Sequence, residues 1–175
     1  MREPDGFRDY VVARQGALVR AAYLMSGDRH LAEDLVQTSL TKAWTRWDRV
    51  SRAGNVDAYV HRILVNTFVA ATRRRWWGEL PAGDRMPETA HADTQPDWTQ
   101  RDTVLAAVRR LPPRQRAVIA LRFYLDQTEA ATAEAMGCSV GTVKSQTARA
   151  LIRLREHLGT EAVRAAVPTP ERGIR

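Results

Sequence analysis

The sequence predicts an all-α protein made of two small helical lobes joined by a flexible linker. Apolar residues recur at three- and four-residue spacing on both sides of residues 80–100, which is the period of amphipathic helices. Apolar–polar alternation never extends beyond a few residues, so no strand is expected. Residues 80–100 have no apolar period, contain Pro81, Pro87 and Pro96, and carry four acids against one base, which is typical of a linker.

The first predicted lobe covers residues 7–79. Its elements are a helix over 7–26, a second helix from Asp28 to about Trp47, a polar loop over 48–55 and a third helix from Asp57 to about Trp77. Gly27 is a helix-ending residue, and Asp28 and Asp57 precede apolar-periodic runs, so both aspartates are predicted N-caps. Trp44 and Trp47 fall on the apolar stripe of the second helix, which predicts that they pack in the core.

The second predicted lobe covers residues 101–158 and is followed by a short tail, 159–175. Its elements are a short helix ending near Leu111, a helix with Pro113 in its first turn, a short helix from Thr128 to Met136 and a long helix from Ser139 to about Leu158. Thr128 and Ser139 are predicted N-caps, and Gly137 is predicted to be the left-handed residue that ends the short helix.

Charge and residue usage favour a nucleic-acid partner. The 175 residues include 27 Lys and Arg against 20 Asp and Glu, for a net charge of +7, and only Lys42 and Lys144 are lysines. The guanidinium group of arginine matches the hydrogen-bonding geometry of phosphates and guanine edges. The use of arginine in place of lysine is also what a GC-rich genome would produce, so the bias has two explanations. The single cysteine, Cys138, excludes a disulfide framework and a cysteine-based zinc site.

Several function classes are not expected. The histidines lie in separate segments without metal-ligand spacing, and no nucleophile–base arrangement stands out, so we expect no metal, no cofactor and no enzymatic activity. No apolar stretch approaches 18 residues, and residues 1–6 carry acids and lack the apolar core of a signal peptide. We therefore expect a cytoplasmic, nucleoid-associated protein with no membrane partner.

Residues 128–145 have the spacing of a helix-turn-helix. Small Ala133 in the first helix lets a second helix cross closely, Gly137 follows at the turn, and Val143 anchors the second helix. The amino-terminal end of the second helix has free N–H groups that suit phosphate or groove docking. The same spacing also fits an ordinary helical hairpin with a solvated basic face.

These segments resemble a known family. Gly137–Ser145, preceded by Leu111–Arg116, resembles region 4 of sigma-70-type factors, in particular the short extracytoplasmic-function (ECF) group and its actinobacterial SigE-like branch. Ala32–Gln37 resembles the region 2 helix by which these factors hold RNA polymerase. Asp57–Asn66, followed by the arginines at 73–75, resembles their promoter-melting helix.

The resemblance implies a dissociable subunit that directs bacterial RNA polymerase core to promoters and helps to open them. Its partners would be the core enzyme, promoter DNA and, as is common in the family, an anti-sigma factor. The residues implied for reading the −35 element are Thr142, Lys144, Ser145, Thr147 and Arg149. Those implied for the −10 region are Asn55, Tyr59, Arg62, Asn66, Arg73, Arg74 and Arg75. Those implied for polymerase binding are Glu33, Asp34 and Gln37.

The alternative from another class is a stand-alone helix-turn-helix regulator that binds duplex DNA without polymerase. Its recognition lobe would look the same, but it would leave the acidic segment Glu33–Gln37 and the basic third helix without a role.

Overall fold

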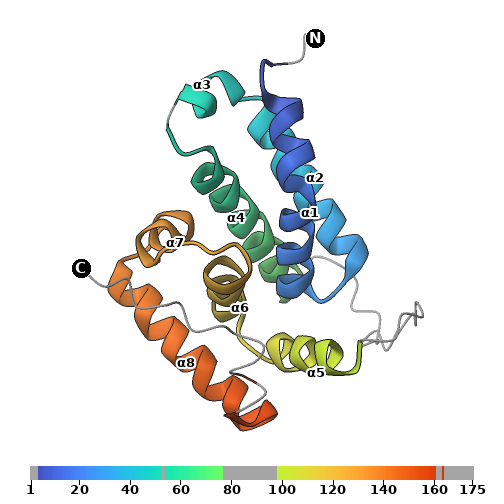
Figure 1. The fold of residues 1–175 in the computed structure, drawn as a ribbon, viewed down its shortest axis with the longest axis vertical. Helices are drawn as coiled ribbons and strands as arrows, with labels where there is room; N and C mark the ends of the chain where they lie inside the picture. Colours follow the sequence, from blue (N-terminus) through green and yellow to red (C-terminus); the bar gives the residue numbers. More distant parts are fainter. Residues whose placement is uncertain (1–3, 53, 77–97, 161–162, 164–175) are drawn as a thin grey trace.

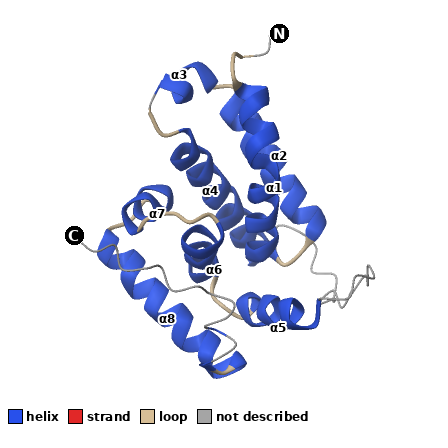
Figure 2. Ribbon diagram, viewed as in Figure 1, coloured by secondary structure: helices blue, strands red, loops and turns tan. Residues whose placement is uncertain are grey.

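A computed structural model describes residues 4–52, 54–76, 98–160 and 163 (Figure 1). The described residues are helical and contain no strand (Figure 2), which confirms the predicted all-α class. The elements are α1 (Phe7–Ser26), α2 (Arg29–Trp44), α3 (Trp47–Arg52), α4 (Val56–Trp76), α5 (Trp98–Arg109), α6 (Pro113–Ile119), the π-helical turn η1 (Ala120–Tyr124), α7 (Glu129–Met136) and α8 (Val140–Leu158). Within these residues, no helix combines the length and the apolar character that crossing a bilayer requires.

In the first lobe, α1 and α2 form a helical hairpin, and α4 packs along α2. Gly27 ends α1 in the left-handed conformation at φ 72°, and the Asp28 side chain accepts the Leu31 N–H as the cap of α2, both as predicted. Phe7 makes edge-on contacts, each 4.9 Å between ring centroids, with Trp44 and Trp47. The two tryptophans therefore belong to the core of this lobe.

The sequence-based prediction was wrong at the loop between the second and third helices. A short helix, α3, occupies most of residues 48–55, and α2 ends at Trp44 instead of Trp47. The reason is long-range: Trp47 is buried and donates its indole N–H to the Asp5 carbonyl at 2.9 Å, and Val50 is buried behind it. These contacts hold the segment against the core. Backbone N–H and C=O groups near the core must be hydrogen-bonded, and a helix provides those hydrogen bonds.

The predicted cap of the third helix was also wrong. The Asn55 side chain, not Asp57, accepts the Ala58 N–H, at 3.0 Å. Asp57 lies in the first turn of α4 and accepts hydrogen bonds from the Tyr10 hydroxyl at 3.0 Å and from Arg14 at 2.8 Å. Burial, followed by the nearby Asp57 carboxylate, raises the pKa of Tyr10. Asp57 therefore ties α4 to α1.

The second lobe differs from prediction at its two ends. Helix α5 begins at Trp98, inside the stretch predicted as linker, and residues 80–97 of that stretch lie outside the described residues. In the predicted tail, Val163 is only 3% exposed and belongs to the core, so the chain after α8 packs back on the lobe at this point.

The helix-turn-helix forms as predicted. Thr128 and Ser139 cap α7 and α8 by accepting the N–H groups of Ala131 and Thr142. Gly137 ends α7 at φ 61°, a left-handed conformation that favours glycine. Val143 is fully buried between the two helices. Local capping signals therefore fixed the ends of both helices.

The two lobes pack against each other. Helix α4 contacts α7, and α1 contacts α5, α6 and η1. From the second lobe, Arg116 places its guanidinium 5.2 Å from the centre of the Phe68 ring and donates to the Met25 carbonyl at 2.7 Å. Arg109 donates to the Gly27 carbonyl. Both arginines thus reach carbonyls at the carboxyl end of α1, where the helix dipole favours positive charge.

The buried side chain of His61 in α4 should make stability dependent on pH. His61 is 4% exposed, and burial lowers its pKa; the charge of Asp57 opposes that shift but is outweighed. Below pH 6.5 the unfolded chain binds a proton that the folded chain excludes. The free energy of unfolding should therefore fall as pH drops from 7 to 5.5, by up to about 1.4 kcal/mol per unit.

Urea unfolding at several pH values measures this slope. The variant His61→Gln should flatten it, whereas His30→Gln, at an exposed position, should keep it. An unchanged slope in His61→Gln would assign the pH dependence to other groups.

Candidate nucleic-acid and polymerase interfaces

Helix α8 presents an exposed face near its amino terminus. Lys144, Ser145 and Arg149 are exposed, whereas Val143, Ala150 and Leu154 hold the opposite side in the core. At 100° per residue, Lys144 and Arg149 point about 140° apart and lie on the two flanks of this face. They cannot both contact one base pair, so each must meet a different part of a duplex.

The hydroxyl residues of α8 are already hydrogen-bonded within the helix. Thr142 shares a 2.9 Å hydrogen bond with Ser139, and Ser145 donates to the Thr142 carbonyl at 3.0 Å. Thr147 is half-buried and donates to the Val143 carbonyl at 2.8 Å. Lys144 and Arg149 are therefore the long side chains that this part of α8 offers to a ligand.

The side chains predicted for the −10 region form a stripe along α4. Tyr59, Arg62, Asn66 and Arg73 lie within about 60° of one another around the helix axis. Arg62, Asn66 and Arg73 are exposed and Tyr59 is half-buried. Asn55 is exposed at the start of the helix, where it caps α4. Arg75 is in the last turn, and its side chain lies outside the described residues.

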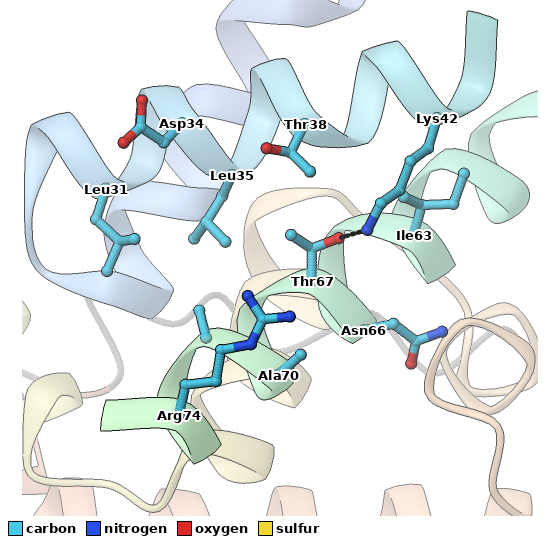
Figure 3. Close-up of a pocket in the computed structure, with 11 residues that line it drawn as sticks. Leu31, Asp34, Leu35, Thr38, Lys42, Ile63, Asn66, Thr67, Ala70 and Arg74 are labelled. Atoms are coloured by element: carbon cyan, nitrogen blue, oxygen red, sulfur yellow. Dashed lines mark hydrogen bonds between the residues drawn. The ribbon is translucent and has the colours of Figure 1, made fainter. Parts of the chain in front are cut away.

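A groove of about 440 Å³ runs along the surface between α2 and α4 (Figure 3). Leu31, Leu35 and Ile63 give it an apolar floor. Lys42 reaches from α2 to the Thr67 hydroxyl of α4, at 3.4 Å, and closes one end. The polar residues of the rim are Asp34, Thr38, Asn66 and Arg74.

This groove is lined by residues that the sequence analysis assigned to two different functions. Asp34 was predicted to bind polymerase, and Asn66 and Arg74 were predicted to bind DNA, yet all three line the same groove. The other two acid–amide residues of α2 are exposed. Glu33 pairs with Arg29 at 3.1 Å, and Gln37 makes no side-chain hydrogen bond to another described residue.

Sequence reasoning missed three residues around these surfaces. Arg109 and Arg116 join the lobes, and Glu129 of α7 lies 3.6 Å from the Lys144 ammonium group. Each contact connects different helices, so helical periodicity gives no signal for it. Within the part of the chain that is described, no three His, Cys, Asp or Glu side chains lie together in a way that could hold a metal ion.

Comparison with known proteins assigns both lobes. Residues 11–78 match the family described as Sigma-70 region 2, and residues 101–154 match Sigma-70, region 4. The RNA polymerase sigma-E factor of Streptomyces coelicolor is 38% identical over 90% of this chain and 89% of its own length. The ECF RNA polymerase sigma factor EcfG of Rhodopseudomonas palustris is 31% identical over 86% of this chain and 83% of its own length.

A solved structure matches the whole arrangement. The sigma factor RpoE from Bartonella quintana, in complex with the anti-sigma factor NepR, has a TM-score of 0.78 and 29% identity. The match covers 90% of this chain and 99% of RpoE, so it includes both lobes in one superposition. The stand-alone regulator is not favoured, because the first lobe also matches a sigma region. This chain belongs to the sigma-70 family, in its extracytoplasmic-function group, and is a promoter-specificity subunit of RNA polymerase.

Proposed function

We propose that the chain divides promoter recognition among three surfaces. Residues 7–79 form the lobe that binds polymerase and the −10 region, and the lobe that reads the −35 element begins with α5 at Trp98 and extends to residue 158, so the connection between the lobes is shorter than the predicted 80–100. The observation that carries the proposal is that α8, α4 and α2 each expose polar side chains, and that these helices lie within the residues that match region 4 or region 2.

On α8, Lys144 and Arg149 are the proposed DNA contacts with the longest side chains. Ser145 lies between them around the helix axis, and Thr142 lies in the first turn of the helix. Lys144, nearer the helix start, would meet base edges, and Arg149 would meet a phosphate. Thr147 is a weaker contact, because it is half-buried and its hydroxyl bonds to the backbone.

On α4, we propose that Tyr59 and Arg62 face the unpaired −10 bases, while Arg73 and Arg75 hold phosphates. Asn55 contributes by fixing the start of the helix. Asn66 and Arg74 lie on the groove shared with Asp34, which supports a position at the boundary between DNA and polymerase. Glu33, Asp34 and Gln37 of α2 form the proposed polymerase surface.

The chain acts in this proposal without catalysis, as a cytoplasmic protein associated with the nucleoid. Opening about a dozen base pairs costs on the order of 17 kcal/mol at roughly 1.4 kcal/mol per step. Each captured base returns only about 1–3 kcal/mol. The free chain should therefore not melt promoters, and the core enzyme must contribute most of the required energy.

An anti-sigma factor is a further proposed partner. The support is that both lobes superpose together on a sigma factor that was crystallised with one. Binding across two lobes in this arrangement would keep α4 and α8 from spanning separate promoter elements.

Replacing Arg149 tests the −35 assignment. In holoenzyme binding to promoter duplexes over a salt range, Arg149→Ala should weaken all −35 sequences alike and lower the salt slope by about one, because one phosphate contact is lost. Arg155→Ala, an exposed arginine in the last turn of the same helix, is the matched control and should leave the slope unchanged. Equal slopes for wild type and Arg149→Ala would remove Arg149 from the phosphate contacts.

A further inference from the structure

Lys144 is paired with an acid at the amino terminus of the neighbouring helix. Its Nζ atom lies 3.6 Å from Oε2 of Glu129, the first residue of α7. Lys144 sits in the second turn of α8, on the flank about 100° from the buried Val143 side of the helix. The capped starts of α7 and α8 are therefore connected by one ion pair across the helix-turn-helix.

The pair remains accessible to solvent and to a ligand. The side chains of Lys144 and Glu129 are 63% and 40% exposed. Exposed pairs of this kind contribute little to stability, because water and salt screen them. The pair instead affects the position of the Lys144 ammonium group. A lysine without such a partner is a flexible point charge that can reach any nearby phosphate.

We propose that Glu129 is a positioning residue for promoter discrimination, which holds Lys144 over the groove side of α8 and away from the phosphate backbone. The carboxylate also neutralises the lysine charge before DNA arrives. A cation that is paired with an internal acid is less available to displace counterions from DNA, so it adds less to sequence-independent affinity than a free lysine does. This inference rests on the proposed reading of the −35 element by α8.

The proposal predicts an unusual charge effect. In Glu129→Gln, Lys144 becomes a free cation, so non-specific affinity should rise several-fold and the salt slope should steepen by about one. Discrimination between the preferred −35 sequence and its point variants should fall, because Lys144 is no longer held at the base edges and its new phosphate contact is the same for every sequence. Lys144→Ala in the wild-type background should relax discrimination at one position while leaving the salt slope unchanged.

A double-variant cycle distinguishes two ways in which Glu129 could act. It could act through Lys144, or its carboxylate could repel DNA phosphates directly. Holoenzyme with each variant is titrated onto duplexes with an intact or a scrambled −35 element over a range of salt, so that the contribution of the core enzyme is common to all. The expected slope of Glu129→Gln/Lys144→Ala is that of the wild type. A steeper slope that persists in the double variant would overturn the proposal, because Glu129 would then act without Lys144.

Two controls complete the design. Glu134→Gln removes an equal charge from α7 at an exposed residue that forms no ion pair within the described residues, and it should leave affinity and slope unchanged. Arg149→Ala reports on α8 itself. If Arg149→Ala lowers the slope and Glu129→Gln changes nothing, this inference fails alone; if neither Arg149→Ala nor Lys144→Ala affects binding, the proposed role of α8 fails.

Discussion

Replacing Phe68 with alanine should lower the free energy of unfolding by about 3–5 kcal/mol, the range for truncating a buried phenylalanine. Phe68 of α4 is 0% exposed and belongs to a core cluster that includes residues of both lobes. Arg116 of α6 lies over its ring and donates to Met25 of α1. Truncation therefore leaves a cavity in the first lobe and removes one of the contacts between the two lobes.

Burial of Arg116 adds to this effect. Burial, and secondarily the like charge of Arg109, lowers the pKa of Arg116, and its Nε atom has no hydrogen-bond partner among the described residues. The Phe68 ring and the Met25 carbonyl are therefore groups that take the place of water around the guanidinium. A cavity at residue 68 should loosen this contact and with it the packing of the lobes.

Urea unfolding followed by circular dichroism measures the change. Val12→Ala, at a position 80% exposed on α1, is the control and should change stability by less than about 0.5 kcal/mol. Because the core is continuous between the lobes, wild type should unfold in one transition and Phe68→Ala in a broader or split one. A loss below about 1 kcal/mol would mean that residue 68 is not packed as described.

The ends of most helices were predictable, because their signals are local. Asp28, Thr128 and Ser139 each bond to an N–H three residues later, and Gly27 and Gly137 take the left-handed conformation that glycine permits. Such signals need no knowledge of the rest of the fold, so sequence alone was sufficient for α1, α7 and α8.

Elements that depend on distant contacts were not predictable. Helix α3 is too short for an apolar period and is held by the bond between Trp47 and Asp5. Asp57 has the sequence context of a cap, but Tyr10 and Arg14 engage its carboxylate. In both cases a residue more than 40 positions away decides the local structure.

The same distinction holds for the functional surfaces. Periodicity placed Lys144 and Arg149 on the exposed side of α8, and the structure has both exposed. It did not indicate that Glu129 neutralises Lys144, or that Asn66 and Arg74 share a groove with Asp34, since these relations cross from one helix to another. Nor did it indicate that Arg109 and Arg116 join the lobes, since both arginines contact carbonyl groups at the end of another helix.

Reversing the charge of Asp34 should have the largest effect on partner binding. Asp34 is exposed on α2 at the rim of the groove and forms no ion pair within the described part of the chain, so its carboxylate is available to a basic partner. In the proposed interface, arginine at this position would face basic groups of the core enzyme. Like-charge contact costs several kcal/mol, so affinity should fall at least about a hundredfold, equivalent to roughly 3 kcal/mol.

Fluorescence anisotropy of the labelled chain with core enzyme measures the affinity, and circular dichroism verifies the fold. Asp34→Asn should give a smaller loss, because it removes attraction without adding repulsion. Asp9→Arg, at an exposed position on α1, makes the same change in net charge and should bind normally, which separates a local contact from general electrostatics. If folded Asp34→Arg binds core enzyme as tightly as wild type, α2 does not form the polymerase interface, and the groove beside it needs another partner.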